Sequence, residues 1–178
     1  MFISPPNYSK TIQVHLQSIR QQLVQLLQRA ERAIVQSERV DVQPLVNDVY
    51  HSFQKTESFI RFQMKDATSP FVRNDKSTTS QEAQQFHKLQ TALHHIEMIG
   101  QLALKENDWT MKERHLVKQT IDEISRAIRY RESIVHSSLE PQLLAWIHES
   151  SRTLQLSSQT VLAYELLALY QLFQSKDG

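Results

Sequence analysis

The hydrophobic pattern is clearest from Tyr8 to Glu38, where apolar residues recur at alternating intervals of four and three. That spacing places them on one face of an α-helix, because residues three and four apart are neighbours on a helical surface. The apolar positions are Ile12, Leu16, Ile19, Leu23, Leu26, Ala30 and Ala33. The intervening positions are Gln and Arg, including Arg20, and predict a polar opposite face. A lone amphipathic helix gains little stability in water, so we expect the chain to supply partners for this stripe.

The same periodicity predicts five further helices. A second helix has Asp41 as its N-cap and Pro44 in its first turn. Its inward residues are Leu45, Val49, Phe53, Ile60 and Met64, widened by Val46, Phe59 and Phe62. A third carries Phe86, Leu89, Leu93, Ile96, Ile99 and Ala103, and a fourth carries Val117, Ile121, Ile124, Ile128 and Val135. Two shorter helices carry Leu143, Leu144, Ile147 and Leu154, and then, after a cap at Ser157, Val161, Leu162, Leu166, Leu169, Leu172 and Phe173.

Local signals add boundaries to these helices. Thr79 with Glu82, and Thr110 with Glu113, match the S/T-x-x-E capping box and predict the starts of the third and fourth helices. Residues 68–80 hold a proline and a Ser/Thr run without apolar periodicity, so we expect a flexible loop there.

These elements predict an all-α fold, an antiparallel helical bundle of four long helices with two shorter C-terminal helices. The chain has 178 residues, and we expect a single domain over residues 1–178. It contains two glycines, which argues against phosphate-cradling loops and a nucleotide-binding α/β fold. The absence of cysteine excludes disulfides and thiol chemistry.

The overall charge is nearly balanced, with 20 basic and 19 acidic residues and a net charge of +1. A balanced charge gives no bulk field to attract nucleic acid, so we expect no nucleic-acid partner. The sequence has no apolar run of about 20 residues and no charged-then-apolar signal pattern.

We also expect no enzyme activity, no cofactor and no metal. Eight histidines invite a metal interpretation, but neither Glu-x-x-His nor His-x-x-x-His occurs in the sequence. The alternative that remains is that His94, Glu97 and Glu57 meet across helices. No Gly-x-Ser-x-Gly, Walker or dinucleotide-binding motif is present.

Positive charge is densest along the fourth predicted helix. Acidic residues interleave with it, and Lys118 and Asp122 stand at i,i+4, which is typical of a solvated, ion-paired face. Within it, the best candidate for a patch that attracts an anion, a partner or an anionic membrane leaflet is Arg126, Arg129, Tyr130 and Arg131.

The last predicted helix, Val161–Phe173, is apolar on most sides. Burial within the bundle is the usual explanation of such a helix. The alternative is that part of it docks on a second copy, and we therefore predict a homodimer through Val161–Phe173.

The N-terminal stretch Phe2-Ile3-Ser4-Pro5-Pro6-Asn7-Tyr8 runs directly into the long Leu/Gln helix. Residues 2–35 resemble the segment that follows the last transmembrane helix in fusaric-acid-resistance-like proteins, which include bacterial aromatic acid exporters. In that family an apolar membrane exit is followed by prolines, a tyrosine and a long amphipathic helix that begins a helical cytoplasmic domain.

The resemblance implies a soluble C-terminal cytoplasmic domain attached to a transmembrane domain upstream of Phe2. It further implies a position at the inner face of the cell membrane, a role in assembly or regulation, and no catalytic residues. The alternative is a free-standing cytosolic helical bundle that serves as an interaction module. The phosphate-uptake regulators also use long helical hairpins, but their metal-binding Glu/Asp-x-x-x-Asp motif is absent here.

Overall fold

The computed structural model describes residues 8–67, 76–105, 108–135, 138–151 and 157–175. Within these residues all regular structure is helical, which confirms the all-α class. The helices are α1 (Tyr8–Val35), α2 (Gln43–Ala67), α3 (Lys76–Lys105), α4 (Met111–Tyr130), α5 (Leu139–Ser150) and α6 (Ser158–Phe173). Most of the predicted flexible loop, residues 68–75, and Leu154 lie outside the described residues, whereas residues 76–80 are helical.

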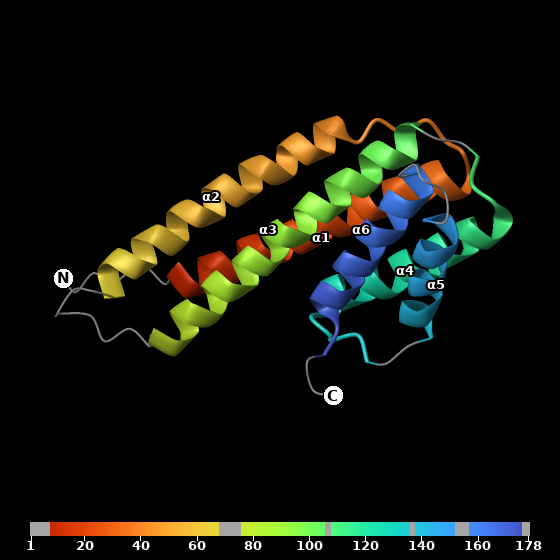
Figure 1. Ribbon diagram of the computed structural model, residues 1–178. Coiled ribbons are helices and arrows are strands. Elements are labelled where there is room, and N and C mark those ends of the chain that lie inside the picture. The colour runs from red at the N-terminus through yellow and green to blue at the C-terminus, as the bar shows by residue number, and fades with distance from the viewer. Residues whose placement is uncertain (1–7, 68–75, 106–107, 136–137, 152–156, 176–178) are drawn as a thin grey trace, which may run out of the picture.

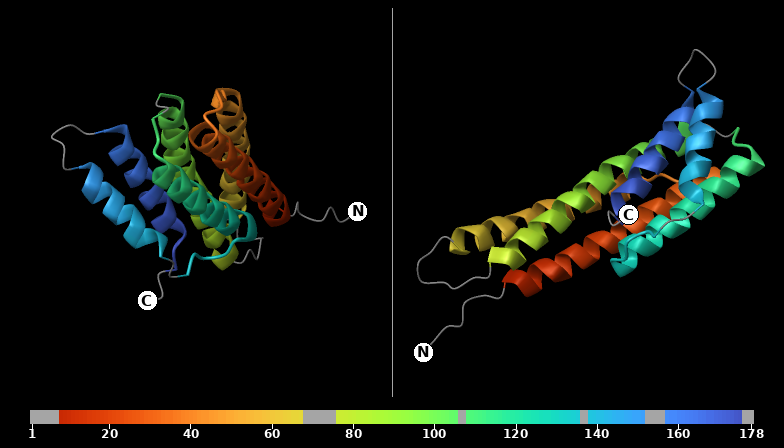
Figure 2. Two further views of the ribbon diagram at one scale, coloured as in Figure 1. Left: turned by 90° about the vertical axis from the view of Figure 1, so that its right-hand side faces the viewer. Right: turned by 60° about the horizontal axis from the view of Figure 1, so that its bottom comes forward.

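The first helix, α1, is the centre of the packing, because it contacts α2, α3 and α4. The last helix, α6, contacts α3, α4 and α5. The helices α1, α3, α6 and α4 therefore form a closed ring, with α2 packed on α1 and α3 and with α5 packed on α4 and α6 (Figures 1 and 2). The first halves of α1 and α3 extend beyond the ring together with α2 (Figure 1).

This arrangement differs from the predicted one in two respects. The short helix α6 belongs to the ring, whereas the long helix α2 flanks it. Furthermore, α1 and α3 run side by side in the same direction, because α2 runs back along both of them (Figure 1). Among the described residues, no helix combines the length and apolar character needed to cross a bilayer.

The predicted stripe of α1 is confirmed, since all seven of its residues are buried. The buried face is wider than predicted and also includes Val24, Leu27 and Ile34. A wide face follows from the position of α1 between three neighbouring helices. Arg20 is buried as well, so its placement on a polar opposite face was wrong.

The stripes of α3 and α4 are confirmed except at one position. The six predicted α3 residues, and Val117, Ile121, Ile124 and Ile128 of α4, are all buried. Val135 is exposed, because α4 ends at Tyr130 and Arg131 follows in the left-handed conformation, with φ of 59°. A left-handed residue at this position is a common way to stop an α-helix.

The outer helix α2 shows how far the pattern can mislead. Val49, Phe53 and Ile60 are buried as predicted, whereas Phe62 and Met64 are exposed, so the predicted burial of these two was wrong. Val46 is buried as well, and Leu45 and Phe59 are half-buried against the core. Two helices cover α2, namely α1 and α3, so apolar residues on its outer side, such as Phe62 and Met64, stay exposed.

Helix caps confirm several of the predicted starts. The Thr110 hydroxyl accepts from the Glu113 N–H at 3.2 Å, and the Glu113 carboxylate accepts from the Thr110 N–H at 2.7 Å, which completes the capping box. The Ser157 hydroxyl accepts from the Thr160 N–H at 3.2 Å. The Asp41 carboxylate accepts from the N–H of Gln43, the first residue of α2, at 2.9 Å.

The predicted capping box of Thr79 and Glu82 was wrong, because α3 already begins at Lys76. Glu82 instead lies fully buried against α1. Its Oε1 accepts from the Ser9 hydroxyl at 2.6 Å and from Gln13 Nε2 at 3.2 Å. The tertiary contact with α1 therefore replaces the local cap.

The two short helices bury most of their predicted residues. In α5, Leu143 and Ile147 are buried and Leu144 is exposed. In α6, Leu162, Leu166, Leu169 and Phe173 are buried, while Val161 and Leu172 are half-buried. Burial within the chain thus accounts for much of the apolar surface of α6, and the homodimer stays a prediction.

Gly100 marks a close approach between α3 and the chain before α2. A methyl group on Gly100 would lie 3.3 Å from Cγ2 of Val42. We expect Gly100→Ala to change the free energy of unfolding by less than about 1 kcal/mol, because the gain in helix propensity offsets this tight contact. Gly100→Leu should lower it by about 2 kcal/mol through overpacking. Urea denaturation followed by circular dichroism would measure both, and equal effects of the two changes would contradict the close approach.

Candidate functional site

A cavity of about 160 Å³, open to solvent on one side, lies where α1, α3, α4 and the end of α6 meet. Its wall is formed by side chains that are far apart in the sequence. They are Arg20, Gln85, Lys88, Leu89, Ala127, Ile128, Arg131, Glu132, Ser133 and Phe173. Three of these side chains are cations and one is an anion, so the cavity is rich in positive charge.

Arg20 is the most deeply buried charged group of this cavity, with 5% of its surface exposed. Its Nη2 donates to Gln85 Oε1 at 3.0 Å, whereas its Nη1 is buried without a hydrogen-bond partner. Burial, reinforced by the positive charge of Arg131, lowers the pKa of the Arg20 guanidinium to about 10. Arg20 therefore remains a cation at neutral pH.

Lys88 and Arg131 bring positive charge from two other helices. The Lys88 ammonium lies 4.7 Å from the centre of the Phe173 ring, a cation–π contact between α3 and α6. Arg131 reaches the cavity because it caps the C-terminus of α4. The one acidic side chain of the wall, Glu132, has an oxygen 3.9 Å from Nε of Arg126, which lies outside the wall.

Main-chain pairing fixes the segment that follows α4 against the end of α6. The Ile134 N–H donates to the Phe173 carbonyl at 2.8 Å, and the Ser175 N–H donates to the Ile134 carbonyl at 3.0 Å. This pairing holds Ser133 and Phe173 on the same side of the cavity. The position of the wall therefore depends on the backbone as well as on side chains.

The predicted patch of Arg126, Arg129, Tyr130 and Arg131 lies at the exposed end of α4. Of these four residues, Arg131 also lines the cavity. Arg20 and Lys88 were not predicted as site residues. The apolar pattern of α1 nevertheless held a signal for Arg20, which stands four residues after Leu16 and three before Leu23, within the apolar face.

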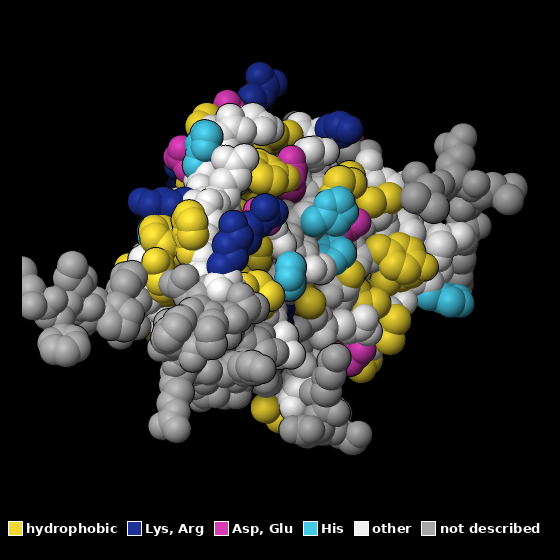
Figure 3. Space-filling model, turned by 90° about the vertical axis from the view of Figure 1, so that its left-hand side faces the viewer, with side chains coloured by type: hydrophobic (Ala, Val, Ile, Leu, Met, Phe, Trp, Pro, Cys, Tyr) yellow, Lys and Arg dark blue, Asp and Glu magenta, His cyan; other side chains and the backbone are white. Residues whose placement is uncertain are grey.

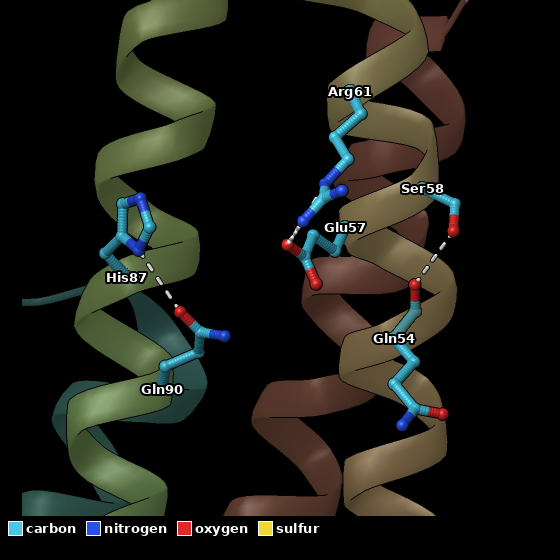
Figure 4. A network of polar contacts seen from close by, with 6 residues as sticks. All are labelled: Gln54, Glu57, Ser58, Arg61, His87 and Gln90. Atoms are coloured by element: carbon cyan, nitrogen blue, oxygen red, sulfur yellow. Dashed lines mark hydrogen bonds and ion pairs between the residues drawn. The ribbon is translucent and has the colours of Figure 1, made fainter.

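The candidate metal group does not assemble. Glu57 pairs with Arg61 on the same helix at 2.7 Å (Figure 4), and Glu97 accepts from the Tyr50 hydroxyl at 2.9 Å. The His94 ring packs against the His95 ring. In the part of the chain that the structure describes, no three His, Asp or Glu side chains are placed to hold a metal ion.

Charge is also not concentrated at the end of the molecule formed by the first half of α1, the second half of α2 and the first half of α3. Figure 3 shows basic, acidic, histidine and hydrophobic side chains interspersed on this face. The polar contacts drawn in Figure 4, such as His87 with Gln90, stay within one helix. This surface has the mixed character of an ordinary solvated face.

A second and larger cavity, of about 410 Å³, lies between α4 and α5. Trp146 forms part of its wall and donates from Nε1 to Oε1 of Glu113 at 3.1 Å. Lys112 and Glu149 face each other across the two helices at 3.6 Å. Its charges are paired across the helices, in contrast to the unpartnered guanidinium nitrogen in the ring cavity.

Comparison with known proteins gives one weak relationship. A "UPF0421 protein" of Bacillus cereus (strain ATCC 10987 / NRS 248) is 20% identical to the chain over 189 aligned positions. The alignment covers 97% of this chain and 53% of that protein, so the chain spans about half the length of the curated relative that it matches. No protein-family model and no solved structure matches the chain.

Proposed function

We propose that this chain is a non-catalytic cytoplasmic helical domain of a fusaric-acid-resistance-like membrane protein, with a role in its assembly or regulation. The main support is the alignment with the UPF0421 protein, which extends over nearly the whole chain but over only 53% of that relative. A protein of that length has room for a second region, and residues 2–35 resemble a membrane exit. On this proposal the domain lies at the inner face of the cell membrane.

The contacts at the start of α1 favour a regulatory role. Ser9 and Gln13, in the first turns of α1, both donate to the buried carboxylate of Glu82 on α3. A movement of a membrane segment placed before α1 would displace Ser9 and Gln13 relative to Glu82. Since α1 also packs on α2 and α4, a displacement of its first turns would be transmitted to the ring.

The alternative is a free-standing interaction module. The exposed apolar side chains of Phe62 and Met64 on the outer helix α2 would be available to a partner. A homodimer through Val161–Phe173 is compatible with both proposals.

Fractionation of the source cells, probed with an antibody against this chain, distinguishes the two proposals. We expect a band much larger than 20.8 kDa in the membrane pellet, retained after a high-salt wash. A cytosolic enzyme and an integral membrane protein serve as fractionation controls. A 20.8 kDa band in the supernatant would overturn the membrane proposal and leave the interaction module.

A further inference from the structure

We propose that the open cavity where α1, α3, α4 and α6 meet binds a compact oxyanion, the carboxylate or phosphate group of a small molecule, with Arg20 as its main ligand. This inference does not depend on membrane attachment, because all residues involved lie on α1, α3, α4, the segment after α4, and α6.

The guanidinium of Arg20 has one nitrogen, Nη1, without a hydrogen-bond acceptor. Nη1 is buried, and a buried donor on a charged group is strongly destabilising unless an acceptor satisfies it. The Gln85 side chain already occupies Nη2, at 3.0 Å. Because Nη1 has almost no exposed surface, an oxyanion in the cavity would reach it after a small turn of the guanidinium. The oxyanion would then supply the missing acceptor and compensate the buried positive charge.

The wall of the cavity contains more cationic than anionic side chains. Arg20, Lys88 and Arg131 carry three positive charges, against one negative charge on Glu132. The helix C-termini of α4 and α6 lie nearby, and each adds about half a negative charge. Cations therefore outnumber anions among the described side chains of the wall, which favours an anion over a cation.

The size of the cavity also suits a small ligand. The cavity measures about 160 Å³, whereas one water molecule occupies about 30 Å³ in the liquid. The space is therefore large enough for a group of several heavy atoms, which would displace the water that fills it otherwise. The apolar side chains of Leu89, Ile128 and Phe173 can contact the part of such a ligand that carries no charge.

Binding should stabilise the ring, because the ligand would touch α1, α3, α4 and α6 at once. A ligand that binds the native state alone raises stability as its concentration increases. Thermal unfolding of the full chain with inorganic phosphate or with acetate would measure this, with sodium chloride at matched ionic strength as the reference. We expect a concentration-dependent rise of Tm beyond the chloride effect with at least one of the two anions, and the stronger anion identifies the source of the oxyanion.

Variants test whether Arg20 is the ligand. We expect Arg20→Met to fold, because an apolar side chain replaces a buried charge, and to lose the Tm rise. Isothermal titration calorimetry with the stronger anion should show binding at least about tenfold weaker, the fold-change of one lost hydrogen bond to a charged group. Arg61→Met on α2, an exposed arginine that does not line the cavity, is the matched control and should bind like the unmodified chain.

Exposed variants keep the test decisive if Arg20→Met does not fold. Lys88→Gln and Arg131→Gln lie at the rim, where substitution is tolerated, and both should weaken binding. The proposal would be overturned if neither anion exceeds the chloride effect at millimolar concentration. It would also be overturned if binding persists in every folded variant of the three cations.

Discussion

Leu23→Ala should lower the free energy of unfolding by about 3 kcal/mol, the usual loss for a leucine removed from a closely packed core. Leu23 is fully buried near the middle of α1, the helix that packs on α2, α3 and α4. The cavity left by the substitution would therefore lie among several helices that cannot all move to fill it. Urea denaturation at equilibrium, followed by circular dichroism, measures the change.

Val14→Ala is the matched control on the same helix, because 63% of the Val14 surface is exposed. Its effect should stay within about 0.5 kcal/mol. Similar losses at Val14 and Leu23 would contradict the orientation of α1 described above, since they would mean that both faces of the helix are covered.

Glu113→Ala should be the second most damaging change, with a loss of about 2–3 kcal/mol. The Glu113 carboxylate has two separate tasks: Oε2 accepts from the Thr110 N–H, and Oε1 accepts from Nε1 of Trp146. Losing the cap accounts for about 1 kcal/mol. Leaving the indole N–H of the buried Trp146 without an acceptor adds about 1–2 kcal/mol.

Glu113→Gln separates these two tasks, because its amide has one acceptor oxygen where the carboxylate has two. We expect a loss smaller than that of Glu113→Ala. In a Trp146→Phe background the donor is absent, so Glu113→Gln should then have little effect, and a double-mutant cycle would measure the coupling. Purely additive effects would show that the contact between Trp146 and Glu113 does not contribute to stability.

Helical periodicity predicted the parts of the fold that are covered on one well-defined face. The stripes of α1, α3 and α4 are buried as predicted because each of these helices has neighbours along most of its length. Met64 of α2 follows the same periodicity and Phe62 was predicted to widen that stripe, yet both are exposed. The sequence shows which face of a helix is apolar, but the number of neighbours that cover it depends on the tertiary arrangement.

The two capping boxes show the same limit at a finer scale. Thr110 and Glu113 form the predicted box, whereas the identical spacing of Thr79 and Glu82 lies inside α3. Glu82 finds two donors on α1, at Ser9 and Gln13. A local motif is decided by competition with such tertiary partners, which a window of four residues does not contain.

The candidate site could be predicted only in part for a related reason. Arg131 belongs to the basic patch that the sequence indicated, but Arg20 and Lys88 lie on other helices. Their approach depends on the parallel packing of α1 and α3, which hydrophobic periodicity does not specify. The burial of Arg20 amid the apolar face of α1 is the feature that turns a surface patch into a cavity.

The closure of the ring by α6 has a consequence for biosynthesis. The ribosome makes α1 before the other described helices, and α6 is the last of them to be made. Until α6 is made, the faces of α3 and α4 that it covers stay open to water. The cavity also lacks the part of its wall that Phe173 of α6 supplies. The first three helices can pack together early, whereas α4 and α5 lack the cover of α6 until it is made. During that interval their apolar surface is open to aggregation and to binding by chaperones.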